Sequence, residues 1–198
     1  SSTMPATLSK LELFWQRWRA KALLTLGLRE QAMEVFRGIL AAKPRDVHAL
    51  GSLAYDALQT GHPAQALPLF EQVLAQAPEL SNAHFNVAFV SEQLGLLDRA
   101  EAEFRAAIAI EEKMDRAWYG LGLVLVRQGR LDEAVVALKR NTKLQPMSPY
   151  AWYQLARVHV DMKQPEEAAK VIRHLKGFEP KVAAQLERET GLKVGQPV

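Results

Sequence analysis

The chain has 198 residues, of which 48% are hydrophobic and 24% are charged. This composition is typical of a globular protein with a core, and it excludes a disordered or low-complexity chain. The formal net charge of +3 is too small to indicate a nucleic-acid-binding protein. The absence of cysteine excludes disulfides, cysteine-ligated zinc and thiol nucleophiles.

The first predicted element is a basic amphipathic helix. Residues 1–12 are expected to comprise an expression remnant (Ser1, Ser2 and Thr3 before Met4) and the start of this helix. Its apolar and basic residues are Leu8, Leu11, Phe14, Trp15 and Trp18, with Lys10, Arg17, Arg19 and Lys21. We expect its apolar side to cover the first repeat as a cap; the alternative is that it lies on a membrane or another protein.

The rest of the chain repeats every 34 residues, an interval that we call the repeat period. Alanine marks this interval, at Ala32, Ala66, Ala100, Ala134 and Ala168. A large apolar residue follows each alanine by four positions, at Phe36, Phe70, Phe104, Leu138 and Ile172. Proline occupies a third column, at Pro44, Pro78, Pro146 and Pro180, where the third copy has Glu112. Such a period predicts a repeat architecture.

Five copies are predicted over residues 13–182, at 13–46, 47–80, 81–114, 115–148 and 149–182, and each reads as two helices. In the first copy Gln16 and Arg19 stand where apolar residues are expected. We therefore expect its first helix to be degenerate or shifted in register, with Trp15 and Trp18 taking over the packing.

The later copies place their breaks at regular positions. Glycine at 61, 95 and 129 ends a helix, because a left-handed closing residue is easiest for glycine, and Lys163 replaces it in the fifth copy. Pro63 and Pro165 are expected in the first turn of a second helix. Pro68 is expected to kink or shorten its helix. Residues 183–198 are predicted to be a C-terminal capping helix and tail.

These residues closely resemble the tetratricopeptide repeat (TPR) family. The fourth copy carries the family's pattern in Trp118, Leu121, Gly122, Leu125, Ala134, Leu138 and Pro146. The resemblance implies an all-α fold, a right-handed α-solenoid of antiparallel helix pairs, whose first helices line a concave groove. Small residues at Ala54, Ala88, Gly122 and Ala156 would let the paired helices approach closely.

The family's groove positions carry a candidate binding surface. They include His48, Ser52 and Gln59, and the site residues that we select are Tyr55, Asn82, Phe85, Asn86, Phe89, Arg116, Tyr119, Arg127, Tyr150, Tyr153, Gln154 and Arg157. Aromatic residues beside Asn and Arg are typical of a protein-binding surface. The rings would receive apolar side chains, Asn82, Asn86 and Gln154 the peptide backbone, and the arginines acidic groups. The alternative is that the rings bridge neighbouring repeats and are buried by stacking.

Other sites are not expected. Some TPR proteins grip a terminal carboxylate with a clamp of Lys, Asn and Arg, but only Asn86 and Arg116 match that pattern here. The histidines show no metal-binding spacing, and no nucleophile elbow or phosphate loop occurs. We predict no catalytic residue, no metal and no cofactor. The expected partner is a protein or peptide, not a nucleic acid, and a membrane is not expected.

Charge is distributed unevenly, with net values of +4 over residues 1–44, −7 over 45–112 and +6 over 113–198. The sequence thus predicts a non-catalytic adaptor or scaffold that binds a peptide segment or a helix in its groove. The alternatives are a self-assembling scaffold that forms homo-oligomers through Trp15, Trp18 and the charge profile, or an accessory domain of a larger enzyme or secretion/assembly complex. The expected location is the cytoplasm, or the periplasm or a membrane anchor if a leader was removed.

Overall fold

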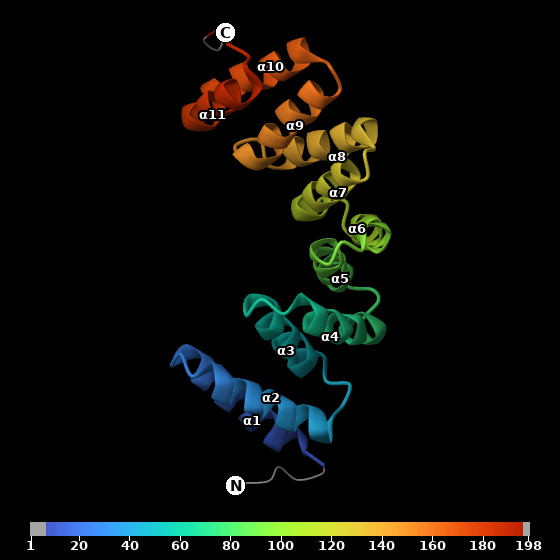
Figure 1. Ribbon diagram of the computed structural model, residues 1–198. Helices are drawn as coiled ribbons and strands as arrows, with labels where there is room; N and C mark the ends of the chain where they lie inside the picture. Colours follow the sequence, from blue (N-terminus) through green and yellow to red (C-terminus); the bar gives the residue numbers. More distant parts are fainter. Residues whose placement is uncertain (1–6, 196–198) are drawn as a thin grey trace. The chain divides into compact units, whose positions relative to one another are not determined.

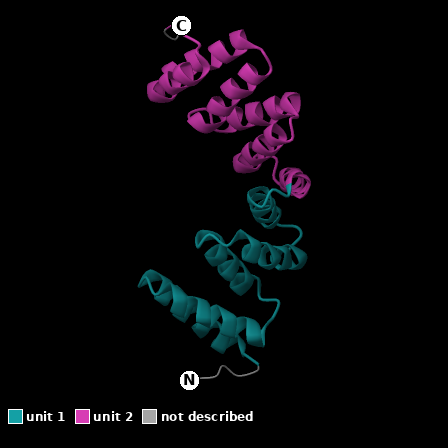
Figure 2. Ribbon diagram, viewed as in Figure 1, with its two compact units in different colours: residues 1–96 teal, residues 97–198 magenta. Residues whose placement is uncertain are grey.

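The computed structural model describes residues 7–195, and within that range it contains eleven α-helices and no strand. The predicted all-α class of fold is confirmed. The chain divides into two compact units, residues 1–96 and 97–198, shown in teal and magenta in Figure 2. The division falls between the two helices of the predicted third repeat, and the two units are described separately below.

Unit 1 contains five helices, which are coloured from blue to green in Figure 1. They are α1 (Lys10–Thr25), α2 (Arg29–Ala42), α3 (Val47–Gln59), α4 (Pro63–Gln76) and α5 (Ser81–Gln93). Each helix packs on the next one along the chain. The unit is therefore built from local helix pairs.

Unit 2 contains six helices. They are α6 (Leu97–Ile110), α7 (Asp115–Arg127), α8 (Leu131–Leu144), α9 (Pro149–Asp161), α10 (Pro165–Lys176) and α11 (Pro180–Thr190). Consecutive helices pack on one another, and α11 also contacts α9. Only the core residues Ala183 and Leu186 of α11 are buried, so α11 closes the end of the unit with a polar outer side.

The turns between paired helices share one backbone conformation. Gly61, Gly95 and Gly129 have φ of 75–80°, in the left-handed region that favours glycine. Lys163 adopts φ 60° at the equivalent place, so the turn persists without glycine. Its amide donates to the Val160 carbonyl at 3.0 Å, as the Gly129 amide does to Val126. Backbone hydrogen bonding therefore closes the turn even where the residue is unfavourable.

The core follows the columns of the repeat. All five recurring alanines are fully buried, and the large residues four positions later are 0–2% exposed. A side chain at Gly122 would place its Cβ 2.7 Å from Leu138 Cδ2, so α7 and α8 touch because glycine stands there. Close approach through small residues, with a large apolar residue opposite, explains why the helices pair as predicted.

The prediction for the first helix was wrong. Trp15 and Trp18 do not supply its packing, because their side chains are 62% and 52% exposed. Nor is the register shifted: Ala20, which lies one repeat period before Ala54, is fully buried in the core of unit 1, where Leu8 is also buried and Leu13 is partly buried. The buried stripe of α1 is short, and its large aromatic residues lie outside it.

Two further expectations concern the bounds of helices. Pro68 does not shorten α4, which keeps the 14 residues found in α2, α6 and α8. The capping helix begins at Pro180 rather than at residue 183, because proline fits the first turn of a helix. Pro63 and Pro165 lie at first turns as expected. Residues 1–6 and 196–198 of the predicted terminal segments lie outside the described residues.

A recurrent tether fastens three of the first helices to the loop before them. His84 Nε2 lies 2.7 Å from the carbonyl of Pro78, while the indole N–H groups of Trp118 and Trp152 donate to Glu112 and Pro146 carbonyls at 2.7 and 2.9 Å. In each case the acceptor lies six residues earlier. The three rings occupy the same repeat position. In α5 a histidine ring nitrogen therefore takes the place of the tryptophan indole nitrogen near the equivalent carbonyl.

Candidate functional site

The predicted site residues lie on the first helices of the pairs. Because residues at i, i+3 and i+4 share a helix face, each helix presents its set on one side. In unit 1, Tyr55 belongs to α3, and α5 carries Asn82, Phe85, Asn86 and Phe89. In unit 2, α7 carries Arg116, Tyr119 and Arg127, and α9 carries Tyr150, Tyr153, Gln154 and Arg157.

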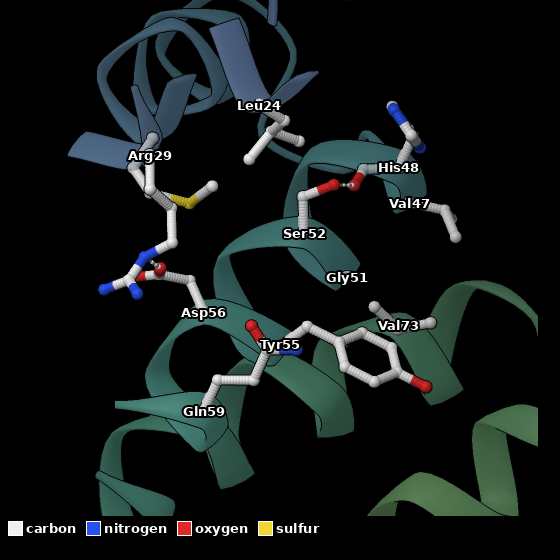
Figure 3. Close-up of a pocket in the computed structure, with 11 residues that line it drawn as sticks. Leu24, Arg29, Val47, His48, Gly51, Ser52, Tyr55, Asp56, Gln59 and Val73 are labelled. Carbon is white, nitrogen blue, oxygen red and sulfur yellow. Dashed lines mark hydrogen bonds and ion pairs between the residues drawn. The ribbon is translucent and has the colours of Figure 1, made fainter. Parts of the chain in front are cut away.

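The unit-1 hollow is a cavity of about 510 Å³ lined by residues of α1, α2, α3 and α4 (Figure 3). Its lining residues are Leu24, Arg29, Met33, Val47, His48, Gly51, Ser52, Tyr55, Asp56, Gln59 and Val73. A Cβ at Gly51 would meet no atom within 4 Å, so the missing side chain helps to keep this space open. The Ser52 hydroxyl donates to the His48 carbonyl at 2.8 Å, and it therefore belongs to the helix rather than to the opening.

An ion pair stands on one side of the unit-1 hollow. Arg29 Nε of α2 and Asp56 Oδ1 of α3 are 2.5 Å apart, and the Asp56 side chain is only 15% exposed. The pair joins the two helices beside the cavity. Partial burial reduces its screening by salt, so it contributes more than a fully exposed pair would.

A second hollow of about 350 Å³ extends the first toward α1. It shares Leu24, His48 and Ser52 with the unit-1 hollow and adds Phe14, Arg17, Trp18, Lys21 and Phe36. The groove prediction did not include this part, because it assumed an irregular first repeat. The signal was present: Phe14 and Trp18 lie one repeat period before His48 and Ser52, which it had placed in the groove.

The unit-2 hollow, of about 320 Å³, brings together four of the predicted residues. Tyr119, Tyr150, Tyr153 and Gln154 line it with Pro149, Val182 and Gln185. Tyr150 is 69% exposed, whereas Tyr119 and Tyr153 are half-buried. Burial raises the pKa of the Tyr119 phenol, and its hydrogen bond with Gln154 acts in the opposite direction. Three tyrosine rings thus surround one opening with a single amide.

The α5 residues form a separate aromatic surface. The rings of Phe85 and Phe89 stack at a centroid distance of 6.1 Å, and Phe89 is 38% exposed. The Tyr55 hydroxyl lies 3.5 Å from Asn86 Oδ1, and the Tyr55 ring packs edge-on against Phe70. Neither phenylalanine lines the unit-1 hollow to which Tyr55 belongs, so the three aromatic site residues of unit 1 do not share one hollow.

One of the predicted arginines already has an acidic partner. Arg157 donates to Glu189 of α11 at 2.7 Å, and the Tyr153 hydroxyl donates to the same carboxylate at 2.6 Å. That hydrogen bond raises the pKa of Tyr153 and lowers the pKa of Glu189. Sequence reasoning missed this contact because 32 residues separate Arg157 from Glu189, outside the repeat pattern. Arg116 and Arg127 are exposed on α7.

In the part of the chain that the structure describes, no three His, Asp or Glu side chains are grouped so as to hold a metal ion. Across residues 7–195, no helix is both long and apolar enough to cross a membrane.

The helix pairs and their small-residue contacts define a class of helical-repeat protein, and comparison with family models agrees. A "Tetratricopeptide repeat" model matches residues 52–115, and the model "Anaphase-promoting complex, cyclosome, subunit 3" matches residues 100–175. The chain belongs to the tetratricopeptide repeat family. No curated protein sequence matches it significantly.

Solved structures of TPR proteins share its fold. A crystal structure of MamA superposes with a TM-score of 0.76 at 20% identity, covering 89% of this chain and 93% of that one. MamA from Desulfovibrio magneticus gives 0.76 at 20% identity over 90% and 96%. YrrB, described as a TPR protein with an unusual peptide-binding site, gives 0.76 at 19% identity over 85% and 88%. At these identities the likeness concerns the fold.

Proposed function

We propose that the chain is a non-catalytic adaptor that binds a segment of another protein on the face formed by the first helices. The observation that carries this proposal is the gathering of Tyr119, Tyr150 and Tyr153 around one hollow beside Gln154. Tyrosine offers a large rigid surface with a polar end, and it is frequent among residues that dominate binding energy. The peptide-binding site that is described for YrrB, a protein of the same fold, adds support.

The ligand is a peptide with apolar anchors. The unit-2 hollow, at about 320 Å³, can receive an apolar side chain between the rings, and Gln154 offers an amide to a peptide group. The unit-1 hollow is a second anchor site, with apolar walls and the open space above Gly51. Each hollow is proposed as a site in its own right.

Selection of peptides from a random displayed library tests the unit-2 site. Peptides selected on the unchanged chain should bind the variant Tyr119→Ala/Tyr153→Ala at least about 30-fold more weakly, since interface hot spots cost about 2 kcal/mol or more each. Val136→Ala, an exposed apolar change on α8, is the matched control. Circular dichroism should show unchanged helix content in both variants.

Binding of the selected peptides to a variant whose hollow is filled tests the unit-1 site. Gly51→Leu projects a side chain into free space, so it should block anchoring there without disturbing the packing of α3. If the selected peptides bind both the double tyrosine variant and Gly51→Leu as tightly as the unchanged chain, the hollows are not binding sites and the proposal is wrong.

A further inference from the structure

A second surface lies on α1, on a face that the later first helices bury. Moving along the chain from Trp15 by one repeat period at a time leads to Ala49, Ala83, Ala117 and Ala151, all of which are 0–4% exposed. The same steps from Ala22 lead to Asp56, Val90, Val124 and Val158, and the three valines are 0–1% exposed. Each of these faces is covered by the preceding helix: α2 on α3, α4 on α5, α6 on α7 and α8 on α9.

On α1 the positions equivalent to these are exposed instead, at Trp15, Arg19 and Ala22. Leu11 and Leu26 continue the stripe at its two ends, at positions that the later repeats also leave exposed or half-buried, and we name these five residues the α1 end face. Leu11, Trp15 and Leu26 are 66%, 62% and 73% exposed, and Ala22 and Arg19 are exposed as well. They follow one another at intervals of three or four positions, so they form one continuous stripe. A contiguous apolar stripe of this kind marks an interaction site, whereas single exposed apolar residues do not.

Arg19 gives the α1 end face its specificity. It stands where the later first helices carry Leu53, Val87, Leu121 and Leu155, and it forms no ion pair with the described residues. A guanidinium covered by an apolar surface without a partner is strongly unfavourable. Whatever covers this face must therefore bring a carboxylate to Arg19. The fold already contains such a pair between consecutive helices, Arg29 of α2 with Asp56 of α3.

We propose that an amphipathic α-helix of a partner protein docks on the α1 end face. It lies across α1 as the second helix of one repeat lies across the first helix of the next. Because Trp15 fills the position that is alanine in every later repeat, the partner helix carries small residues opposite its ring. It carries Asp or Glu opposite Arg19. This proposal is independent of peptide binding in the hollows.

The charges disfavour a second copy of this chain as the occupant. If two α1 end faces met in antiparallel fashion about a two-fold axis, Arg19 at the centre of the stripe would face its own equivalent. End-to-end joining would bring Arg19 toward α11, whose exposed charged residues are Lys181, Arg188 and Glu189, and the Glu189 carboxylate already accepts from Tyr153 and Arg157. Both arrangements therefore place like charges together.

The test uses a labelled synthetic peptide of residues 97–110, the α6 segment that packs on α7, with the change Phe104→Ala, because the Phe104 ring lies against Gly120 of α7 where α1 carries Trp18. Its carboxylates are Asp98, Glu101 and Glu103, and a second peptide replaces these three with lysine. Fluorescence anisotropy measures binding to the full chain and to Trp15→Ala and Arg19→Glu, with Val136→Ala as the matched exposed control. Circular dichroism verifies folding, which both α1 changes should preserve because the side chains are exposed.

The acidic peptide should bind the unchanged chain and the Val136→Ala control equally, and Trp15→Ala and Arg19→Glu about tenfold or more weakly. The lysine peptide should prefer Arg19→Glu to the unchanged chain. The proposal is overturned if neither peptide binds saturably, or if both bind alike whatever the charge at position 19. It is also overturned if Trp15→Ala instead abolishes self-association in light scattering, or binding to vesicles of phosphatidylserine and phosphatidylcholine.

Discussion

Replacing Lys163 with glycine should stabilise the protein. Lys163 is a non-glycine residue at positive φ, 60°, in the turn where other repeats have glycine. A left-handed conformation costs an L-residue about 1–2 kcal/mol. Glycine removes that cost but gives the unfolded chain more freedom, worth about 0.4–1 kcal/mol. The turn's hydrogen bonds, from Lys163 to Val160 and from Gln164 to His159, come from the backbone and remain. The expected net gain is about 0.5–1 kcal/mol.

Thermal unfolding followed by circular dichroism measures this gain. For a chain of about 150–250 residues, 1 kcal/mol corresponds to about 2–4 °C, so Lys163→Gly should raise Tm by about 1–4 °C. Lys163→Ala separates loss of the lysine from relief of the backbone, and it should give no such rise. Gly129→Lys, the reciprocal change, should lower Tm by a similar amount. A Lys163→Gly protein no more stable than the original, or a Lys163→Ala protein equally stabilised, would refute the reasoning.

Three further outcomes are expected in unit 2. Glu189→Ala should lower the pKa of Tyr153 toward its ordinary value of 10.0, because the carboxylate that accepts the hydrogen bond of the phenol is gone; NMR titration of the tyrosine ring would show this. The folded-state pKa of Glu189 is below the ordinary 4.5, so its stabilising contribution with Arg157 is complete above that pH and is lost as the pH falls through the lowered pKa. Denaturant unfolding at acid pH should therefore show a shallower loss in Glu189→Ala. Gly122→Ala should destabilise by about 1–2 kcal/mol in urea unfolding, because its Cβ would press on buried Leu138.

The repeat columns made most of the helices predictable. Ala134 and Leu138 are buried in the structure because helix pairs need a small residue beside a large one, and that need is local in sequence. Trp15 was misplaced for the opposite reason. Its apolar side chain is compatible with burial, but burial depends on a neighbouring helix, and the sequence of α1 alone does not reveal whether one covers that face.

The candidate site was predictable only in part. Tyr119 and Tyr153 line one hollow because the repeat period sets them on the inner sides of α7 and α9. The unit-1 hollow depends on the absence of a side chain at Gly51 and on residues from four helices that meet there, a tertiary arrangement that the repeat spacing does not encode. The contact between Arg157 and Glu189 depends on where α11 lies after the last repeat, a tertiary arrangement without a periodic signal.

The loop before α3 is fastened by charged groups instead of the tether found before α5, α7 and α9, and this difference has an electrostatic consequence. α3 carries Leu50 at the tether position, which has no donor. Its loop is fastened by Asp46 instead, which accepts from the Ala49 amide at 2.9 Å and pairs with Arg17 of α1 at 2.5 Å. Ring-nitrogen bonds to carbonyls are insensitive to ionic strength, whereas an attraction between charges weakens with added electrolyte. Salt should therefore loosen the joint before α3, which flanks the unit-1 hollow, and leave the later joints unchanged.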